Sequence, residues 1–266
     1  MPTIIADTTD GYLDKSAYSW AGARDAASAD IAYVWQNDAH ASVWHMPAPH
    51  DTVRNISRCF FAFDTSGINS IPPSATLNLH GINNENANII VVKATAPDLT
   101  TGIALADFDA IDGFVAGATM AGNVTDYSAA FSAGSWNMSG YNIITLNAAA
   151  LSDMAALFKI AIVEYTHDYL NVAPGGTTLY KTNWYTANNA SNKPYIDYVP
   201  GPPWDYFEED AYETQSSAPH EPNFDSNKYK KLSEEYTRTT RQVPFSKGIK
   251  GPANLRGNTA YTATKG

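Results

Sequence analysis

Two hydrophobic patterns with a period of two occupy residues 58–81, which read RCFFAFDTSGINSIPPSATLNLHG. In the first seven residues apolar side chains fill both alternating sets of positions, which predicts a strand that is buried on both faces and central in a sheet. In the last eight residues apolar and polar positions alternate, which predicts a strand with one solvated face. Pro72 and Pro73 indicate that the residues between these two strands form a connection, because proline lacks the N–H that a ladder hydrogen bond needs.

Similar runs predict further strands at residues 31–35, 41–46, 89–93, 141–146, 158–165, 177–185 and 195–199. Helical spacing of apolar residues predicts a short surface helix at 103–114. Asn147 is a typical N-cap and predicts a second helix within 148–158, while residues 21–28 are also compatible with a helix. Many short strands without βαβ alternation predict an all-β fold, an antiparallel sandwich.

The composition changes at Pro200, which divides the chain into a sandwich (residues 1–199) and an arm (residues 200–266). The arm has few aliphatic residues and cannot bury a core that offsets its backbone entropy. We interpret it as an extended, mostly irregular segment that orders on partner subunits, and a disordered tail is the alternative. Its spaced aromatic side chains are the predicted partner-binding residues: Trp204, Tyr206, Phe207, Tyr212, Phe224, Tyr229, Tyr236, Phe245 and Tyr261.

Charge is distributed unevenly between these two parts. Residues 1–200 contain 18 Asp and Glu against 8 Lys and Arg, whereas residues 201–266 contain 9 of each kind. An acidic sandwich is unsuited to nucleic acid or to an anionic membrane surface, so neither is expected as a partner.

The single cysteine, Cys59, lies within the predicted central strand and excludes a disulfide framework. The N-terminal residues lack the basic start and apolar run of a signal peptide, and no stretch approaches the ~18 apolar residues of a membrane span. We therefore expect a protein that folds in a reducing cytoplasm.

Five segments resemble, in this order, the disaggregatase-related and carbohydrate-binding-module-like family of jelly-roll domains. They are ADTTDGYLDKSAYSWAGARDA, the 58–81 segment, WNMSGYNIITLNAAAL, EYTHDYLNVAP and ANNASNKPYIDYV. The resemblance implies a jelly-roll β-sandwich over residues 5–199, with Cys59 where the family has glycine. Such domains occur as sugar-binding modules, as cell-surface modules and in phage virion proteins. In the arm, VPFSKGIKGPANLRG also resembles stretches of phage structural proteins.

Sequence motifs of catalysis are missing: there is no G-x-S-x-G, phosphate-binding glycine loop, H-E-x-x-H or C-x-x-C. Glu164 with Asp168 is a conceivable pair of glycosidase acids, but the sequence does not fix their separation. We expect a protein that is not an enzyme.

Two ligand sites are predicted. Asp7, Asp10 and Asp14 offer hard oxygen ligands for a structural calcium ion, as in some jelly rolls of the family it resembles, and ordinary turn aspartates are the alternative. Trp136 lies in the glycine- and serine-rich segment SAGSWNMSG, where it is the first candidate for stacking on a sugar, with core or rim packing as the alternative.

The expected function is that of a non-enzymatic virion structural protein, such as a phage decoration, head-fibre or tail-associated component assembled in the host cytoplasm. Its arm would bind other virion proteins and copies of itself in a homo-oligomer. Assembly is favoured because sugar binding leaves the arm unexplained. The alternative is a carbohydrate-binding module or adhesin that recognises a host-surface or extracellular glycan.

Overall fold

A computed structural model describes residues 1–46, 53–154 and 156–201, so that the arm beyond Gly201 and its nine aromatic residues lie outside the described residues. Residues 1–68 and 72–200 form one compact unit. Its strands in the described part are β1 (Thr3–Ile5), β2 (Gly11–Ala17), β3 (Ile31–Val34), β4 (Asp38–His45), β5 (Arg54–Thr65), β6 (Ser74–Glu85), β7 (Ile89–Lys93), β8 (Tyr141–Thr145), β9 (Ala156–Glu164), β10 (Leu179–Tyr185) and β11 (Tyr195–Val199).

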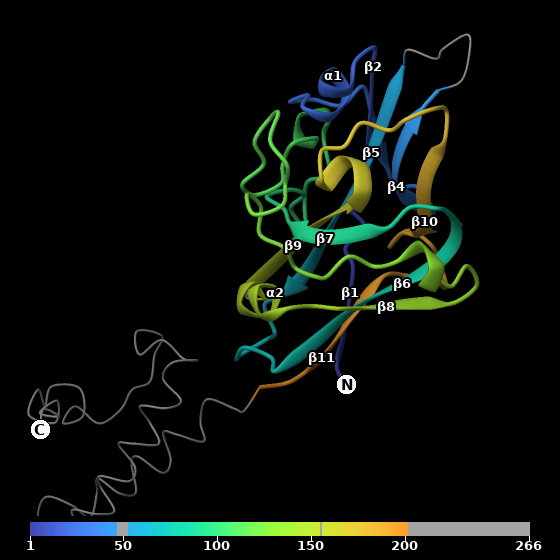
Figure 1. Ribbon diagram of the computed structural model, residues 1–266. Helices are drawn as coiled ribbons and strands as arrows, with labels where there is room; N and C mark the ends of the chain where they lie inside the picture. Colours follow the sequence, from blue (N-terminus) through green and yellow to red (C-terminus); the bar gives the residue numbers. More distant parts are fainter. Residues whose placement is uncertain (47–52, 155, 202–266) are drawn as a thin grey trace, which may run out of the picture. The chain divides into compact units, whose positions relative to one another are not determined.

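All pairings between these strands are antiparallel and follow the order β1-β11-β6-β10-β4-β5-β2-β3, with β8 on β6, β9 on β5 and β7 on β9. The sheet divides along β5: Arg54 to Ser57 pair with β4, whereas Cys59 to Thr65 pair with β9. Beyond this division β4, β10, β6, β11 and β8 form a first layer that packs over a second layer of β5, β9 and β7 (Figure 1). The predicted antiparallel all-β sandwich is confirmed.

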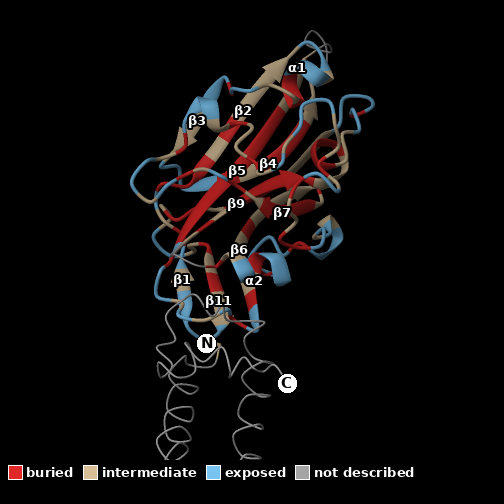
Figure 2. Ribbon diagram, turned by 90° about the vertical axis from the view of Figure 1, so that its left-hand side faces the viewer, coloured by how far each residue is buried: buried red, intermediate tan, exposed pale blue. Residues whose placement is uncertain are grey.

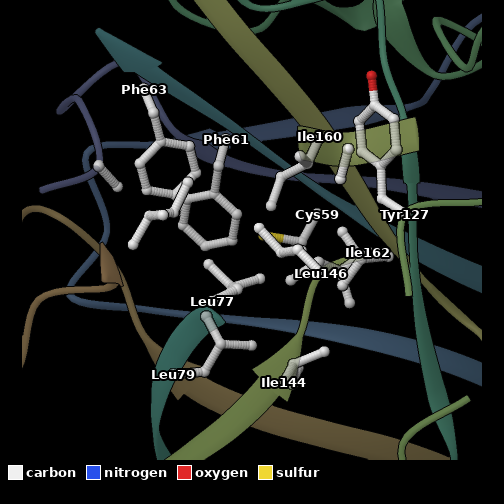
Figure 3. Packing of buried hydrophobic residues seen from close by; sticks show 14 of the residues in the cluster. Cys59, Phe61, Phe63, Leu77, Leu79, Tyr127, Ile144, Leu146, Ile160 and Ile162 are labelled. Atoms are coloured by element: carbon white, nitrogen blue, oxygen red, sulfur yellow. The ribbon is translucent and has the colours of Figure 1, made fainter. Parts of the chain in front are cut away.

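The main core fills the space between the layers. Figure 3 shows Phe61, Cys59 and Ile160 of the second layer facing Leu77 and Leu79 of the first. A second core covers the opposite side of β5 and β9, where Ile56, Phe60 and Val163 meet residues that follow β7. With apolar contacts on both sides, β5, β9 and β7 are the most deeply buried of the described strands (Figure 2). The prediction that residues 58–64 form a central strand is therefore confirmed.

The helices are shorter than predicted. Helix α1 spans Trp20–Arg24, and helix α2 spans Ala148–Asp153, where the Asn147 side chain accepts hydrogen bonds from the N–H groups of Ala149 and Ala150 as predicted. The predicted helix at 103–114 is wrong: only Leu105–Asp107 forms a 3-10 turn (η1). The backbone of residues 110–112 instead forms hydrogen bonds with the end of β7 and the residues that follow it: Thr95 N–H donates to Ala110 O, and Asp112 N–H donates to Lys93 O.

A buried ionic cluster joins β5 to the segment after β9. Arg58 donates from Nε and Nη2 to the two oxygens of Asp168, at 2.8 and 2.7 Å. It also donates to the carbonyls of Phe108 and Arg24, each at 2.9 Å. Arg24 Nε donates to Asp168 O at 2.8 Å, and both arginines and Asp168 are fully buried.

Aromatic rings and a short π-helix surround this cluster. The Arg58 guanidinium lies 4.4 Å from the ring centre of Phe108 and 4.7 Å from that of Phe114, within cation–π distance. Asp168 lies in the π-helical turn η3 (Tyr165–Tyr169). The Glu164 carboxylate caps this turn by accepting hydrogen bonds from the N–H groups of Thr166, His167 and Asp168. Glu164 and Asp168 thus both act within the fold, as a cap and as a counter-ion.

We predict that Asp168→Asn lowers the free energy of unfolding by about 3–5 kcal/mol, because it leaves two buried guanidinium groups without their shared counter-ion. Denaturant unfolding measures the loss. The matched control is Asp30→Asn, which removes the partly exposed Lys15–Asp30 pair and should cost about 1 kcal/mol or less. Equal losses for the two variants would contradict a structural role for the cluster.

Candidate functional site

The strands of the first layer place aromatic side chains on their outer face, opposite the core. In β10, Trp184 is fully buried while the next residue, Tyr185, is half-exposed. In β6, Leu79 lies in the core and His80 lies outside it. Strict alternation along each strand therefore gathers aromatic rings on the solvent side of the sheet.

Four of these rings form an unbroken row across four strands. Tyr195 of β11 contacts Tyr141 of β8 with ring centres 5.0 Å apart, and Tyr141 contacts His80 of β6 at 5.1 Å. His80 in turn contacts Tyr185 of β10 at 5.4 Å. Two of the three contacts are edge-on, the arrangement that aromatic quadrupoles favour.

Three further rings continue the row beyond β10. His40 of β4 lies 4.2 Å from Tyr12 of β2, and Tyr12 stacks on Tyr33 of β3 at 4.5 Å with only 13° between the ring planes. Register joins the two groups: Asn183 is opposite His40 and Tyr185 is opposite Asp38, so Tyr185 and His40 are diagonal neighbours on one face.

We call these seven residues the aromatic track: Tyr195, Tyr141, His80, Tyr185, His40, Tyr12 and Tyr33. All seven residues are partly exposed, with most of their surface buried. They come from seven different strands, each of which is held by ladder hydrogen bonds to its neighbours. The track is therefore a preformed surface on a rigid sheet.

Polar side chains run beside the track. Register aligns Asp14, Ser57, Ser42 and Lys181 across β2, β5, β4 and β10. The Ser57 hydroxyl lies 2.8 Å from that of Ser42 and 3.1 Å from His40 Nε2. Two buried acceptors in this part of the face, Asp14 Oδ1 and Asn183 Oδ1, have no hydrogen-bond partner. Both oxygens are closed to solvent, and a buried water is the type of partner that satisfies such atoms.

The track carries no positive charge at His40 near neutral pH. Burial, with the nearby charge of Lys181, lowers the pKa of His40 from 6.5 to about 3. Burial also raises the pKa of Tyr12, Tyr141 and Tyr195 above the ordinary value of 10.0, so that their hydroxyls stay protonated. The tyrosines thus present neutral hydroxyl groups that both donate and accept.

Trp136 is not placed as a sugar-stacking platform. Its side chain is 8% exposed and belongs to the main core, where its ring lies 5.9 Å from Phe131 and 6.2 Å from Trp184. The surrounding glycines and serines suggested an open loop, but the Trp136 ring turns inward from it. Of the two interpretations of this residue, core packing is the one that the structure supports.

The three predicted calcium ligands have separate roles. Asp10 is fully buried and accepts hydrogen bonds from Ala187 N–H at 2.8 Å and from Asn188 Nδ2 at 3.3 Å. Asp7 accepts from Thr9 N–H, and Asp14 lies in the polar row on β2. Within the described ranges, no group of three or more His, Cys, Asp or Glu side chains is placed to hold a metal ion.

A cavity of about 160 Å³ lies elsewhere, beside Lys93, Tyr127 and Asp153. Its polar groups bond to one another: Lys93 Nζ lies 2.9 Å from Asp153, and the Tyr127 hydroxyl donates to the same carboxylate at 2.6 Å. These groups are mutually satisfied, so the cavity offers a ligand little beyond shape.

Comparison with known proteins gives no family for this chain: no family model and no curated protein matches it. None of the helices in the described ranges is long and apolar enough to cross a membrane. Most of the track was not predicted from sequence. The usable signal was the alternation of aromatic with aliphatic residues, as in Tyr195-Ile196 and Tyr12-Leu13.

Asp10 predicts a pH dependence of stability. Burial raises its pKa from 3.8 to about 7 against the opposing hydrogen bond from Ala187, so between these values the folded chain holds a proton that the unfolded chain releases. The free energy of unfolding therefore falls as pH rises from 4 to 7, by about 1.4 kcal/mol for each unit of the shift.

Asp10→Asn removes this titration. We expect the variant to gain stability relative to the wild-type chain as pH rises from 4 to 8, measured by denaturant unfolding at each pH. A constant difference between the two proteins across this range would contradict the assignment.

Proposed function

We propose that the sandwich is a non-enzymatic glycan-binding module and that its ligand lies on the aromatic track. The observation that carries this proposal is the row of seven partly exposed rings beside the partly exposed side chains of Asp14 and Lys181. Sugars present C–H groups that pack on aromatic faces and hydroxyls that bond to carboxylates, amides and tyrosine hydroxyls. A surface that places aromatic rings beside polar side chains can contact the C–H groups and the hydroxyls of one sugar at the same time.

The polar row argues against a protein partner at this surface. Centres of protein–protein interfaces are depleted of charged side chains, whereas Asp14 and Lys181 both lie beside the middle of the track. A hydroxyl-rich ligand gains from the same groups, because hydrogen bonds to charged partners are the stronger ones.

A second candidate function is that of a virion structural protein whose arm mediates assembly. It is favoured by the sequence of residues 200–266, which contains nine spaced aromatic residues and little else that is apolar. In this segment five acidic residues lie within 205–213, and all nine Lys and Arg follow from Lys228 onward. It is favoured too by the resemblance to domains found in phage virion proteins. The two functions are compatible, because a particle component can also recognise a surface glycan.

We predict that the full chain binds glycans on an array and that Tyr12→Ala weakens this binding about tenfold, since Tyr12 contacts both of its neighbours in the track. Tyr18→Ala is the matched control, because Tyr18 is 82% exposed and takes part in none of the ring contacts of the described residues. Binding that is unaffected by Tyr12→Ala, with both variants folded by circular dichroism, would place the ligand elsewhere.

For the second candidate, a chain ending at Gly201 should retain the melting temperature of the sandwich and should fail to incorporate into particles. The measurement is the amount of each protein in purified particles after co-expression with the other particle components. Incorporation of the shortened chain at the level of the full chain would exclude an assembly role for the arm.

A further inference from the structure

The geometry points to an extended, uncharged polysaccharide chain as the ligand of the aromatic track, bound with its length across the strands. This inference rests on the proposed glycan-binding function and makes it more specific. It concerns the size of the ligand, its charge and its direction on the sheet, each of which follows from a different set of residues.

The length of the track sets the size of the ligand. The sheet order β8-β6-β10-β4-β5-β2-β3 leads from Tyr141 to Tyr33, and neighbouring strands are ~4.8 Å apart, so the track extends for roughly 25–30 Å, with Tyr195 beside Tyr141 at its far end. A single sugar ring is similar in size to an aromatic side chain and covers one or two of the seven rings. Only a chain of several sugars contacts both Tyr195 and Tyr33.

The direction of the row sets the orientation. Successive track residues lie on different strands: five of the six successive pairs are in ring contact, and Tyr185 and His40 are diagonal neighbours by register. The polar row Asp14, Ser57, Ser42 and Lys181 also runs across the strands. A linear ligand that follows either row therefore lies across the strands, with rings on one side and hydrogen-bonding groups on the other.

The charges on this face set the charge of the ligand. Asp14, Asp38 and Asp197 lie on the same face as the track, against Lys181. Neutral His40 adds no positive charge, and residues 1–200 as a whole have a net charge of −10. A uronic acid polymer would bring further negative charge to this surface, whereas a neutral polymer offers hydroxyl donors to the carboxylates.

The buried acceptors mark the middle of the track. One of them is Oδ1 of Asn183, which pairs with His40 across β10 and β4. The other is Oδ1 of Asp14, which follows Tyr12 by two residues in β2. Asn183 therefore lies beside the point where the two groups of rings meet, whereas Asp14 lies beside the second group. A ligand that binds across this junction contacts both groups, which is a further reason to expect a chain rather than a terminal sugar.

The test is calorimetry of the full chain with oligosaccharides of two and six residues from three neutral polymers, namely β-1,4-glucan, β-1,3-glucan and β-1,4-mannan, and with an alginate hexasaccharide as the anionic probe. We expect a neutral hexasaccharide to bind at least about tenfold more tightly than its disaccharide and more tightly than the alginate probe. Tyr33→Ala and Tyr195→Ala, at opposite ends of the track, should each weaken hexasaccharide binding about fivefold.

The controls separate the inference from the function on which it rests. Tyr18→Ala should bind the hexasaccharide as the wild-type chain does, and melting temperatures should be similar for all variants. Equal affinity for disaccharide and hexasaccharide, an effect of only one end variant, or a preference for alginate would overturn the inference and leave glycan binding intact. No binding of any carbohydrate, here or on the array, would overturn both.

Discussion

The salt bridge between Arg58 and Asp168 is the interaction on which the two cores depend. It lies on β5 where the sheet divides, and it ties this strand to the turn after β9, to α1 and to the carbonyl of Phe108. Burying these charges carries a desolvation cost, which is offset only because nearly every donor of Arg58 has a partner. The cluster therefore disfavours any arrangement of these four segments that leaves a buried charge unpaired.

The division of the sheet at β5 also explains where the aromatic track lies. Before the division β2, β5, β4 and β10 share one continuous sheet, and after it β4 and β10 turn away to cover the main core. The outer face of the first layer thus continues without interruption onto β2 and β3. Rings from strands far apart in the chain, such as Tyr12 and Tyr195, therefore lie on one surface.

Local patterns predicted much of this fold. The bounds of β7 and β11 match their apolar runs, and the cap at Asn147 was visible as a residue type before an apolar segment. β2 was missed, because Leu13 is its single large aliphatic residue and the polar residues that follow show no apolar alternation. The prediction of a β-sandwich depended only on the number of short predicted strands and on the absence of βαβ alternation.

The ionic cluster and the aromatic track were less predictable, because both depend on contacts between distant residues. Arg58 and Asp168 are 110 positions apart, and nothing local to either identifies the other. Trp136 illustrates the opposite error, since its polar neighbours indicated exposure while its burial is due to Phe131 and Trp184. Likewise, a tyrosine in an alternating strand is recognisable as outward-facing, but its neighbours across the sheet follow from register alone.

Gly81 connects the buried core to the exposed track. A Cβ atom at this position would lie 2.1 Å from Asn137 O and 2.7 Å from Trp136 Nε1, so the close packing of the Trp136 segment on β6 requires glycine. Opposite Gly81 the register with β10 shifts by one residue: Trp184 pairs with Gly81, whereas Asn183 pairs with Asn83. The extra residue is a β-bulge, which restores the outward direction of the next side chain after the strand bends. Asn83 consequently lies on the same outer face as Asn183, so the polar side chains beyond the bulge stay on the face that carries the track.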